Sequence, residues 1–124
     1  MQTICLVEDD KITRKLFVML LERAEFSVKE FDEGASALDW IRTNTPDAVL
    51  SNIVLSGAIG GVEILHEVRE VLKRQTPVLA LTSFVRRGDR EKYLEMGFND
   101  CVAKPIDPQS FGKDFRTMLA AAVN

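Results

Sequence analysis

The sequence predicts an α/β fold, a doubly wound parallel sheet of five strands, from two observations. Short apolar runs alternate with amphipathic runs five times along the 124 residues. The apolar runs at 3–7, 47–53 and 77–81 are almost continuous, as in parallel strands that helices cover on both faces. Five βα units joined by tight connections form such a sheet with right-handed crossovers.

The strands are predicted from short runs of apolar residues that turn residues bound. The first and fourth are apolar runs, the second alternates apolar and polar residues, and the third follows a turn at Pro46. The fifth is short. The predicted strands are Thr3–Val7, Phe26–Phe31, Asp47–Ile53, Pro77–Leu81 and Asp100–Ala103.

The helices are predicted from apolar residues that recur with helical spacing. The predicted helices are Lys11–Ala24, Gly34–Thr43, Val62–Lys73, Asp89–Met96 and Pro108–Ala122. In the first helix a stripe at spacing four is expected to face the core: Ile12, Leu16, Leu20 and Ala24. Phe17, Val18 and Leu21 add apolar bulk beyond this stripe, so we expect some of them to be exposed or at a subunit contact. The core stripe expected for the third helix is Val62, Leu65, Val68 and Leu72.

Composition indicates one domain over residues 1–124. Hydrophobic residues make up 46% and charged residues 28%, with a net charge of −3. This balance and the lack of a basic run argue against a nucleic-acid or membrane surface. The apolar runs are too short to span a bilayer and the N-terminus lacks a basic signal start, so we expect a cytoplasmic protein. Cys5 and Cys101 are expected to be free thiols, and the lone His66 cannot found a metal cluster.

Polar residues follow four of the predicted strands. Glu8-Asp9-Asp10 follows the first, Asn52 ends the third, Thr82 follows the fourth and Lys104-Pro105 follows the fifth. Ligands of doubly wound sheets bind at the carboxyl ends of the strands, so these groups are expected to form one site. No glycine-rich loop follows the first strand, which argues against a nucleotide or flavin site.

The acidic residues favour a cation at this site. Adjacent carboxylates repel each other, and Mg²⁺ binds hard oxygen ligands while needing only one or two protein carboxylates. The alternative is that Asp9 or Asp10 merely caps the helix that follows. Lys104 could neutralise a phosphoryl oxygen, and the X-Pro bond that follows could hold a fixed turn, cis or trans.

With these four motifs in this order, the chain resembles the receiver domain of bacterial two-component response regulators. The resemblance runs from Ile4–Asp10 through Pro46–Leu50 to Ala80–Ser83 and Lys104-Pro105. It implies a flavodoxin-like (βα)5 sheet with strand order 2-1-3-4-5 and a role in phosphorelay signalling. In that family an aspartate at the place of Asn52 accepts a phosphoryl group from a histidine kinase, with Mg²⁺ bound.

The resemblance assigns a role to each strand-end residue. Glu8, Asp9 and position 52 match the metal site, Thr82 matches the switch hydroxyl, and Lys104 matches the lysine that contacts phosphate. The implied partners are a histidine kinase or phosphotransfer protein and downstream signalling proteins. A homodimer is a further option, because the face of the fourth helix, fifth strand and fifth helix commonly mediates contacts in the family. On this face Tyr93, Arg87 and Arg90 are the candidate interface residues, against the alternative of a solvated charged helix.

Three departures from the family pattern bear on function. Asn52 carries an amide, and an amide oxygen should not form an acyl phosphate. The amide also replaces one anionic ligand, so Mg²⁺ binding should be weaker. The loop with Ser56, Gly57 and Gly60 is about one residue longer than usual and is expected to be flexible. Cys101 stands where the family usually has an aromatic switch residue.

These departures predict a degenerate receiver that acts through protein contacts and is not an enzyme. The alternatives are a phosphoacceptor at a neighbouring residue, Ser56 or Ser83, and an ordinary receiver in which asparagine was substituted for aspartate. Ser51 should point to the opposite face and Asp47 should lie at the other end of the strand, so both are discounted. A Mg²⁺-dependent phosphohydrolase or transferase, or a redox flavoprotein, would need groups that the sequence lacks.

Overall fold

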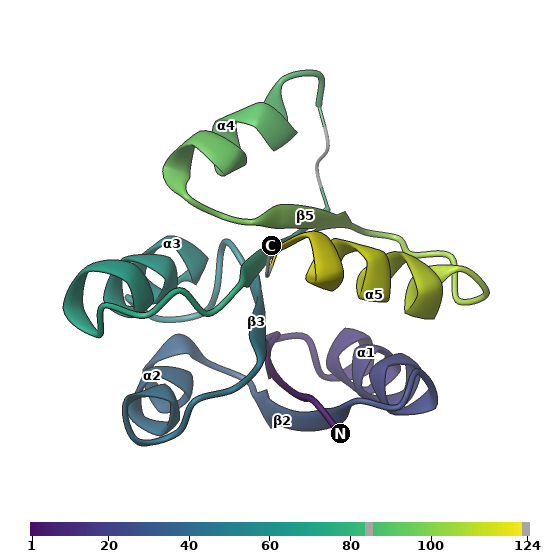
Figure 1. The fold of residues 1–124 in the computed structure, drawn as a ribbon, viewed down its shortest axis with the longest axis horizontal. Coiled ribbons are helices and arrows are strands. Elements are labelled where there is room, and N and C mark those ends of the chain that lie inside the picture. The colour runs from purple at the N-terminus through teal and green to yellow at the C-terminus, as the bar shows by residue number, and fades with distance from the viewer. Residues whose placement is uncertain (84–85, 123–124) are drawn as a thin grey trace.

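The computed structural model describes residues 1–83 and 86–122, which fold as a parallel sheet between two layers of helices (Figure 1). The five strands are β1 (Thr3–Val7), β2 (Ser27–Phe31), β3 (Ala48–Asn52), β4 (Val78–Thr82) and β5 (Asp100–Ala103). The helices are α1 (Lys11–Arg23), α2 (Gly34–Thr43), α3 (Gly61–His66) with its π-helical continuation η1 (Glu67–Val71), α4 (Asp89–Met96) and α5 (Phe111–Ala122). The sheet order is β2-β1-β3-β4-β5, which confirms the predicted doubly wound, flavodoxin-like fold.

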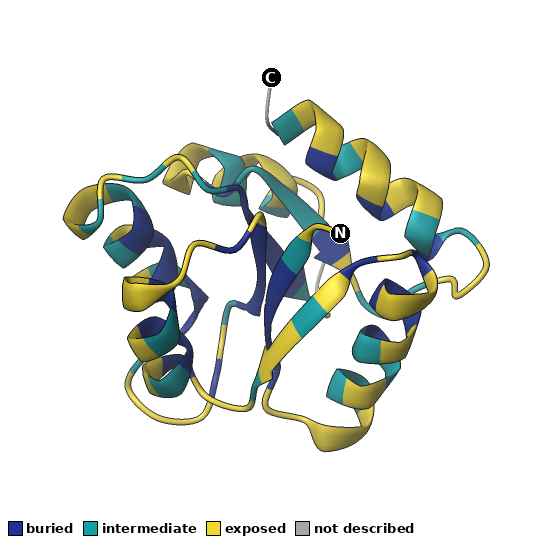
Figure 2. Ribbon diagram, turned by 60° about the horizontal axis from the view of Figure 1, so that its bottom comes forward, coloured by how far each residue is buried: buried dark blue, intermediate teal, exposed yellow. Residues whose placement is uncertain are grey.

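The two faces of the sheet carry separate hydrophobic cores. In Figure 1 α1 and α5 lie to the right of the sheet, and α2 and α3 lie to the left. Alternate residues of β1 enter opposite cores: Ile4 and Leu6 pack with α1 and α5, whereas Cys5 and Val7 pack with α2 and α3. The buried strands at the centre of the sheet and the exposed helix surfaces are visible in Figure 2. This alternation explains why the central strands are apolar on both faces.

The predicted core stripe of α1 is wrong at its first residue. Ile12 is 81% exposed. Phe17 and Leu21 belong to the group of which we expected some members to be exposed, yet they are 1% and 0% exposed. The core face of α1 comprises Phe17, Leu20, Leu21 and the following Ala24. A strict spacing of four drifts around a helix of 3.6 residues per turn, so the stripe left the core face at its N-terminal end. Phe17 instead meets Phe111 of α5 edge-on, with 5.5 Å between ring centroids.

Two helices also begin or end away from their predicted limits. The turn at residues 107–110 keeps Pro108 outside α5: the Asp107 carboxylate accepts a hydrogen bond from the Gln109 N–H at 2.9 Å, and its carbonyl accepts from Phe111 at 3.0 Å. The third helix starts one residue early at Gly61 and changes to π-helix after His66. Ile64, absent from the predicted stripe, is fully buried, and His66 is exposed.

The pairing of the strands aligns their carboxyl ends. Val7 of β1 lies beside Ser51 of β3, so the residues that follow, Glu8 and Asn52, emerge next to each other. Thr82 of β4 lies beside Ala103 of β5, directly before Lys104. In the described part of the chain no helix is long and apolar enough to cross a membrane.

The observed core face of α1 predicts a large loss of stability for one substitution and almost none for another. Phe17→Ala should lower the free energy of unfolding by about 3 to 5 kcal/mol, because it removes a buried ring from a packed core. Ile12→Ala should change it by less than about 0.5 kcal/mol, because that side chain is exposed. Urea unfolding of both variants measures the difference, and an equal cost for the two would contradict this packing.

Candidate functional site

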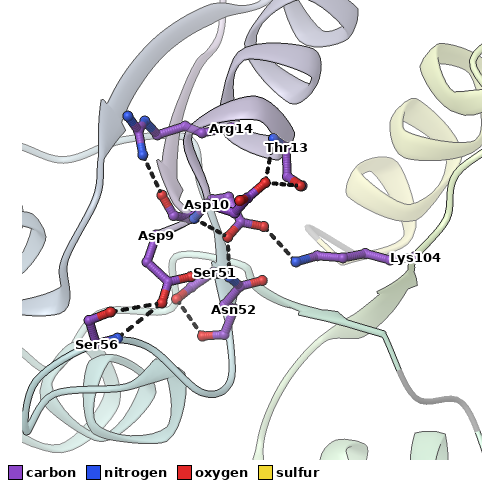
Figure 3. Close-up of polar contacts among 9 residues, drawn as sticks. Asp9, Asp10, Thr13, Arg14, Ser51, Asn52, Ser56 and Lys104 are labelled. Carbon is purple, nitrogen blue, oxygen red and sulfur yellow. Dashed lines mark hydrogen bonds and ion pairs between the residues drawn. The ribbon is translucent and has the colours of Figure 1, made fainter.

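Polar side chains from separate strands meet at the carboxyl edge of the sheet (Figure 3). Glu8 and Asp9 follow β1, Asn52 ends β3, and Lys104 follows β5. Together with Thr82 at the end of β4, these groups line one cavity. The structure therefore brings together five of the six residues that the sequence placed at the metal, phosphate and switch positions, and the sixth is Cys101.

The Asn52 side chain is held by the acidic pair. Its Nδ2 donates hydrogen bonds to Glu8 Oε2 at 2.5 Å and to Asp9 Oδ1 at 3.3 Å, and the residue is only 6% exposed. The opposite orientation of the amide would turn its oxygen toward two carboxylates, so electrostatics determine which atom faces them. The amide hydrogens thus partly neutralise the acids at the point where a cation would lie.

Glu8 is the most deeply buried charged group of the site, with 0% exposure. Its Oε2 accepts from Asn52 and from the Asp10 N–H at 3.0 Å, and its Oε1 accepts from Lys104 Nζ at 2.5 Å. The Lys104 side chain is 21% exposed, and the Lys104-Pro105 peptide bond is cis. A buried carboxylate is costly unless it is paired and hydrogen-bonded, and Glu8 meets both conditions.

Asp9 joins the site to the loop that follows β3. Its Oδ2 accepts hydrogen bonds from the Ser56 N–H and hydroxyl, both at 3.1 Å. Partial burial raises the pKa of Asp9, but hydrogen bonds from Ser56, from Glu8 and from the backbone together lower it, so the pKa lies below its ordinary value. Asp9 is therefore ionised at neutral pH and available as an anionic ligand.

Asp10 has the capping role that was the alternative for the acidic run. Its Oδ2 accepts from the Thr13 N–H at 2.9 Å and the Thr13 hydroxyl at 2.6 Å at the start of α1. These bonds lower the pKa of Asp10. The three acids therefore have different roles: Asp10 caps α1, whereas Glu8 and Asp9 accept hydrogen bonds from Asn52.

The donor set fits a divalent cation through two carboxylates and one amide oxygen. Within residues 1–83 and 86–122, no group of three or more His, Cys, Asp or Glu side chains is placed to hold a metal ion. A cation between Glu8 and Asp9 would therefore depend on Asn52 Oδ1 and on water for further ligands. Among the described residues, Asn52 Oδ1 is buried without a hydrogen-bond partner. Because the amide nitrogen faces the acids, the amide would have to turn before this oxygen could act as a ligand.

Cys101 does not belong to the described lining of this cavity, and its place at the switch position stays a prediction. Its Cα pairs with Ala80, two positions before the strand end, and its side chain packs against the core on the face of the sheet that α2 and α3 cover. Burial and the neighbouring Asp100 charge raise the pKa of the Cys101 thiol. Tyr93 of α4 lines the cavity instead, and its ring meets Phe98 edge-on at 6.1 Å.

Backbone geometry explains why two positions of the loop after β3 are glycine. Gly57 adopts a φ of +90°, a conformation that L side chains rarely take. A Cβ on Gly60 would lie 2.5 Å from the Ile53 carbonyl oxygen, so no side chain fits there. These constraints explain the residues without requiring the loop to be flexible, and that expectation stays a prediction.

The discounted acceptors lie where strand geometry placed them. Ser51 is fully buried, and its hydroxyl donates to the Asn52 carbonyl oxygen at 2.9 Å. Asp47 lies at the opposite end of the sheet, where its carboxylate accepts from the Thr3 N–H at 2.7 Å. Ser83 lines the cavity with its side chain exposed.

The α4 surface carries the predicted interface residues. Arg87 is exposed, and Arg90 pairs with Asp100 at 3.0 Å. α4 buries no residue, and Tyr93 is half-buried. This arrangement matches the description of a solvated charged helix, and the interface stays a prediction.

Sequence reasoning missed two features of the site. Tyr93 was assigned to an interface because Tyr is enriched in interface hot spots. The polar sequence of α4 gave no signal that this ring lies beside the cavity. Arg14 was also missed. Its guanidinium donates to the Glu8 carbonyl oxygen at 2.9 Å and pairs with Glu30 at 3.1 Å, which fixes the end of β1.

The model of the response regulator receiver domain family matches residues 4–116. The chain belongs to this family. It is a receiver domain of two-component signalling, and receiver domains are in general signalling modules rather than catalysts.

Similar proteins cover nearly the whole receiver domain. The polar-differentiation response regulator DivK of Brucella ovis is 30% identical over 122 residues, which is 98% of both chains. An uncharacterised 14.6 kDa protein of Leptolyngbya boryana is 35% identical over 85% of this chain and 80% of its own length. A structure described as a response regulator of Chloroflexus aurantiacus superimposes with a TM-score of 0.84 and 31% identity over 96% of this chain and 98% of that chain.

A fourth relative was solved with a metal ion. The receiver domain of sensor histidine kinase PA1611 of Pseudomonas aeruginosa, 26% identical with a TM-score of 0.80, has magnesium coordinated in its active-site cleft. It covers 96% of this chain, and this chain covers 98% of it.

Removing the Ser56 hydroxyl should raise the pKa of Asp9. Because the folded pKa of Asp9 lies below its unfolded value, the stability it contributes is present above the unfolded pKa and is lost as the pH falls through the folded pKa. Ser56→Ala should raise the folded pKa toward its ordinary value and reduce this acid-dependent loss. Carboxyl ¹³C NMR titration measures the pKa, with Ser83→Ala as the control, and an unchanged Asp9 pKa in Ser56→Ala would contradict the assignment.

Replacing the amide by a carboxylate should make stability depend on a cation. Asn52→Asp loses the two donated hydrogen bonds and adds a third acid, so in EDTA it should lower the free energy of unfolding by about 1 to 3 kcal/mol. Mg²⁺ should restore most of this loss in the variant and have less effect on the unaltered chain. Urea unfolding with and without Mg²⁺ provides the measurement. Equal stability of the two proteins in EDTA would show that the amide does not neutralise the acids.

Proposed function

We propose that this receiver domain signals through protein contacts that do not require phosphorylation at the end of β3. The observation that carries the proposal is the amide of Asn52, whose nitrogen is engaged by Glu8 and Asp9. A carboxylate oxygen attacks phosphorus as an anion, whereas an amide oxygen is neutral and its lone pair is delocalised. The chain therefore keeps the scaffold of the site and lacks its nucleophile.

Mg²⁺ binding in this proposal is weaker than in a receiver with an aspartate at position 52. Only two anionic ligands, Glu8 and Asp9, remain, and Lys104 already compensates part of the Glu8 charge at 2.5 Å. The magnesium-bound relative supports a cation at this place in the fold. When bound, the cation would supply Lewis-acid polarisation of phosphoryl oxygens, while Glu8 and Asp9 would hold it.

A second candidate function is phosphoryl acceptance by Ser56. Its hydroxyl donates to Asp9 Oδ2 at 3.1 Å, which is an arrangement in which a carboxylate can take a proton from a nucleophile. The lowered pKa of Asp9 makes this carboxylate a weak base at neutral pH. We therefore rank Ser56 below the phosphorylation-independent function. We also rank Ser83, which lines the cavity, below it.

The partners we propose are a histidine kinase or phosphotransfer protein and downstream signalling proteins in the cytoplasm. The hybrid signal transduction histidine kinase I of Dictyostelium discoideum, which is 30% identical over 95% of this chain, supports this choice. The matched region makes up 7% of that kinase. On α4, Arg87, Arg90 and Tyr93 are the residues we propose for a contact or a homodimer, since Arg and Tyr are enriched in interface hot spots.

The proposal is tested by mass spectrometry after incubation with acetyl phosphate and Mg²⁺. The unaltered chain should gain no phosphoryl group, whereas Asn52→Asp should gain one, because the rest of the site is in place. Ser56→Ala and Ser83→Ala variants locate any unexpected acceptor. A phosphoryl group on the unaltered chain would overturn the proposal. Failure of Asn52→Asp to gain one would show that position 52 is not the sole defect.

A further inference from the structure

The Asn52 amide is satisfied on one side only. Its nitrogen donates to two carboxylates, whereas its buried oxygen has no hydrogen-bond partner. A buried carbonyl oxygen without a donor costs free energy, so such an atom calls for an explanation. The residue is 6% exposed, so bulk solvent has little access to compensate it.

The two ends of an amide have nearly the same shape and opposite polarity. Rotation by about 180° about the Cβ–Cγ bond exchanges Nδ2 and Oδ1 with little change in packing. In the structure the nitrogen faces the two carboxylates, and Figure 3 shows the Asn52 side chain among the polar groups of this site. With a divalent cation between Glu8 and Asp9, the nitrogen would face a positive charge and the oxygen would be its natural ligand.

We propose that Asn52 is a cation-dependent amide switch. Without a divalent cation its Nδ2 occupies the two carboxylates. When Mg²⁺ binds between Glu8 and Asp9, the amide rotates and presents Oδ1 to the ion. The cation and the amide hydrogens compete for the same two oxygens, Glu8 Oε2 and Asp9 Oδ1. The inference uses the site of the proposed function, but it does not depend on how that function signals.

The contacts around the switch keep the rotation local. Glu8 Oε1 accepts from Lys104 and Asp9 Oδ2 accepts from Ser56, whereas the Asn52 nitrogen donates to the other oxygen of each carboxylate. Both carboxylates can therefore keep these partners while their other oxygens turn from the amide to the ion. The oxygen that would reach the ion is Asn52 Oδ1, which has no hydrogen-bond partner among the described residues.

The experiment is ¹H–¹⁵N NMR of the side-chain amides, first in EDTA and then during titration with Mg²⁺. Asn52→Ala assigns the Asn52 pair by its loss from the spectrum. The backbone N–H groups of Asp10 and Ser56, which donate to Glu8 and Asp9, report cation binding separately. The Asn44 side chain, which donates to the Trp40 carbonyl oxygen at 2.9 Å, is the internal control.

Mg²⁺ should shift the Asn52 amide protons upfield and speed their exchange with water, since they lose two carboxylate acceptors. The Asn44 pair should not move. Asn52→Asp, which has no amide to displace and one more anionic ligand, should bind Mg²⁺ about tenfold more tightly or better. These results would be obtained whether or not any residue is phosphorylated, so they are independent of the test of the proposed function.

Two outcomes would overturn the inference. If the backbone signals of Asp10 and Ser56 move with Mg²⁺ while the Asn52 pair stays unchanged, the cation binds without rotation of the amide. If no signal of the site responds at any Mg²⁺ concentration up to that which saturates Asn52→Asp, the amide excludes the cation instead of yielding to it.

Discussion

The buried carboxylate of Glu8 is the constraint on which the rest of the site depends. A charge with no exposed surface is tolerated only when donors surround it, and Glu8 has three: Lys104 Nζ, Asn52 Nδ2 and the Asp10 N–H. These donors come from the ends of β5 and β3 and from the turn into α1. The carboxylate therefore links three segments that are far apart in sequence, and it does so only because parallel pairing brings their carboxyl ends to one edge.

The amide of Asn52 changes the charge balance of this edge without changing its shape. Glu8 and Asp9 contribute two negative charges and Lys104 one positive charge, and the amide hydrogens are directed at both acids. In a receiver with aspartate at this position, the third acid would make a cation far more necessary. In the function we propose, Asn52 lacks the nucleophile and also lowers the demand for a metal ion, so one residue would account for both properties of the degenerate receiver.

Much of this arrangement could be predicted from the sequence. Nearly continuous apolar strands gave the sheet, and the acids, Asn52, Thr82 and Lys104 at the strand ends gave the site, because strand direction alone determines where such residues emerge. The core face of α1 did not follow from a spacing of four, because a helix turns once every 3.6 residues and the stripe therefore left the core at Ile12. Phe17 is buried in the core that α1 shares with the sheet and α5. The place of Tyr93 beside the cavity depends on how α4 docks, which its polar sequence does not reveal. The direction of the Asn52 amide depends on two carboxylates from another strand.

The central claim is that the Asn52 amide nitrogen, and not its oxygen, faces Glu8 and Asp9 when no cation is bound. A neutron crystal structure of the protein prepared in EDTA measures this directly, because it locates the deuterium atoms. We expect two deuterium atoms on the amide atom that faces the two acids. An amide oxygen facing the acids would contradict the claim.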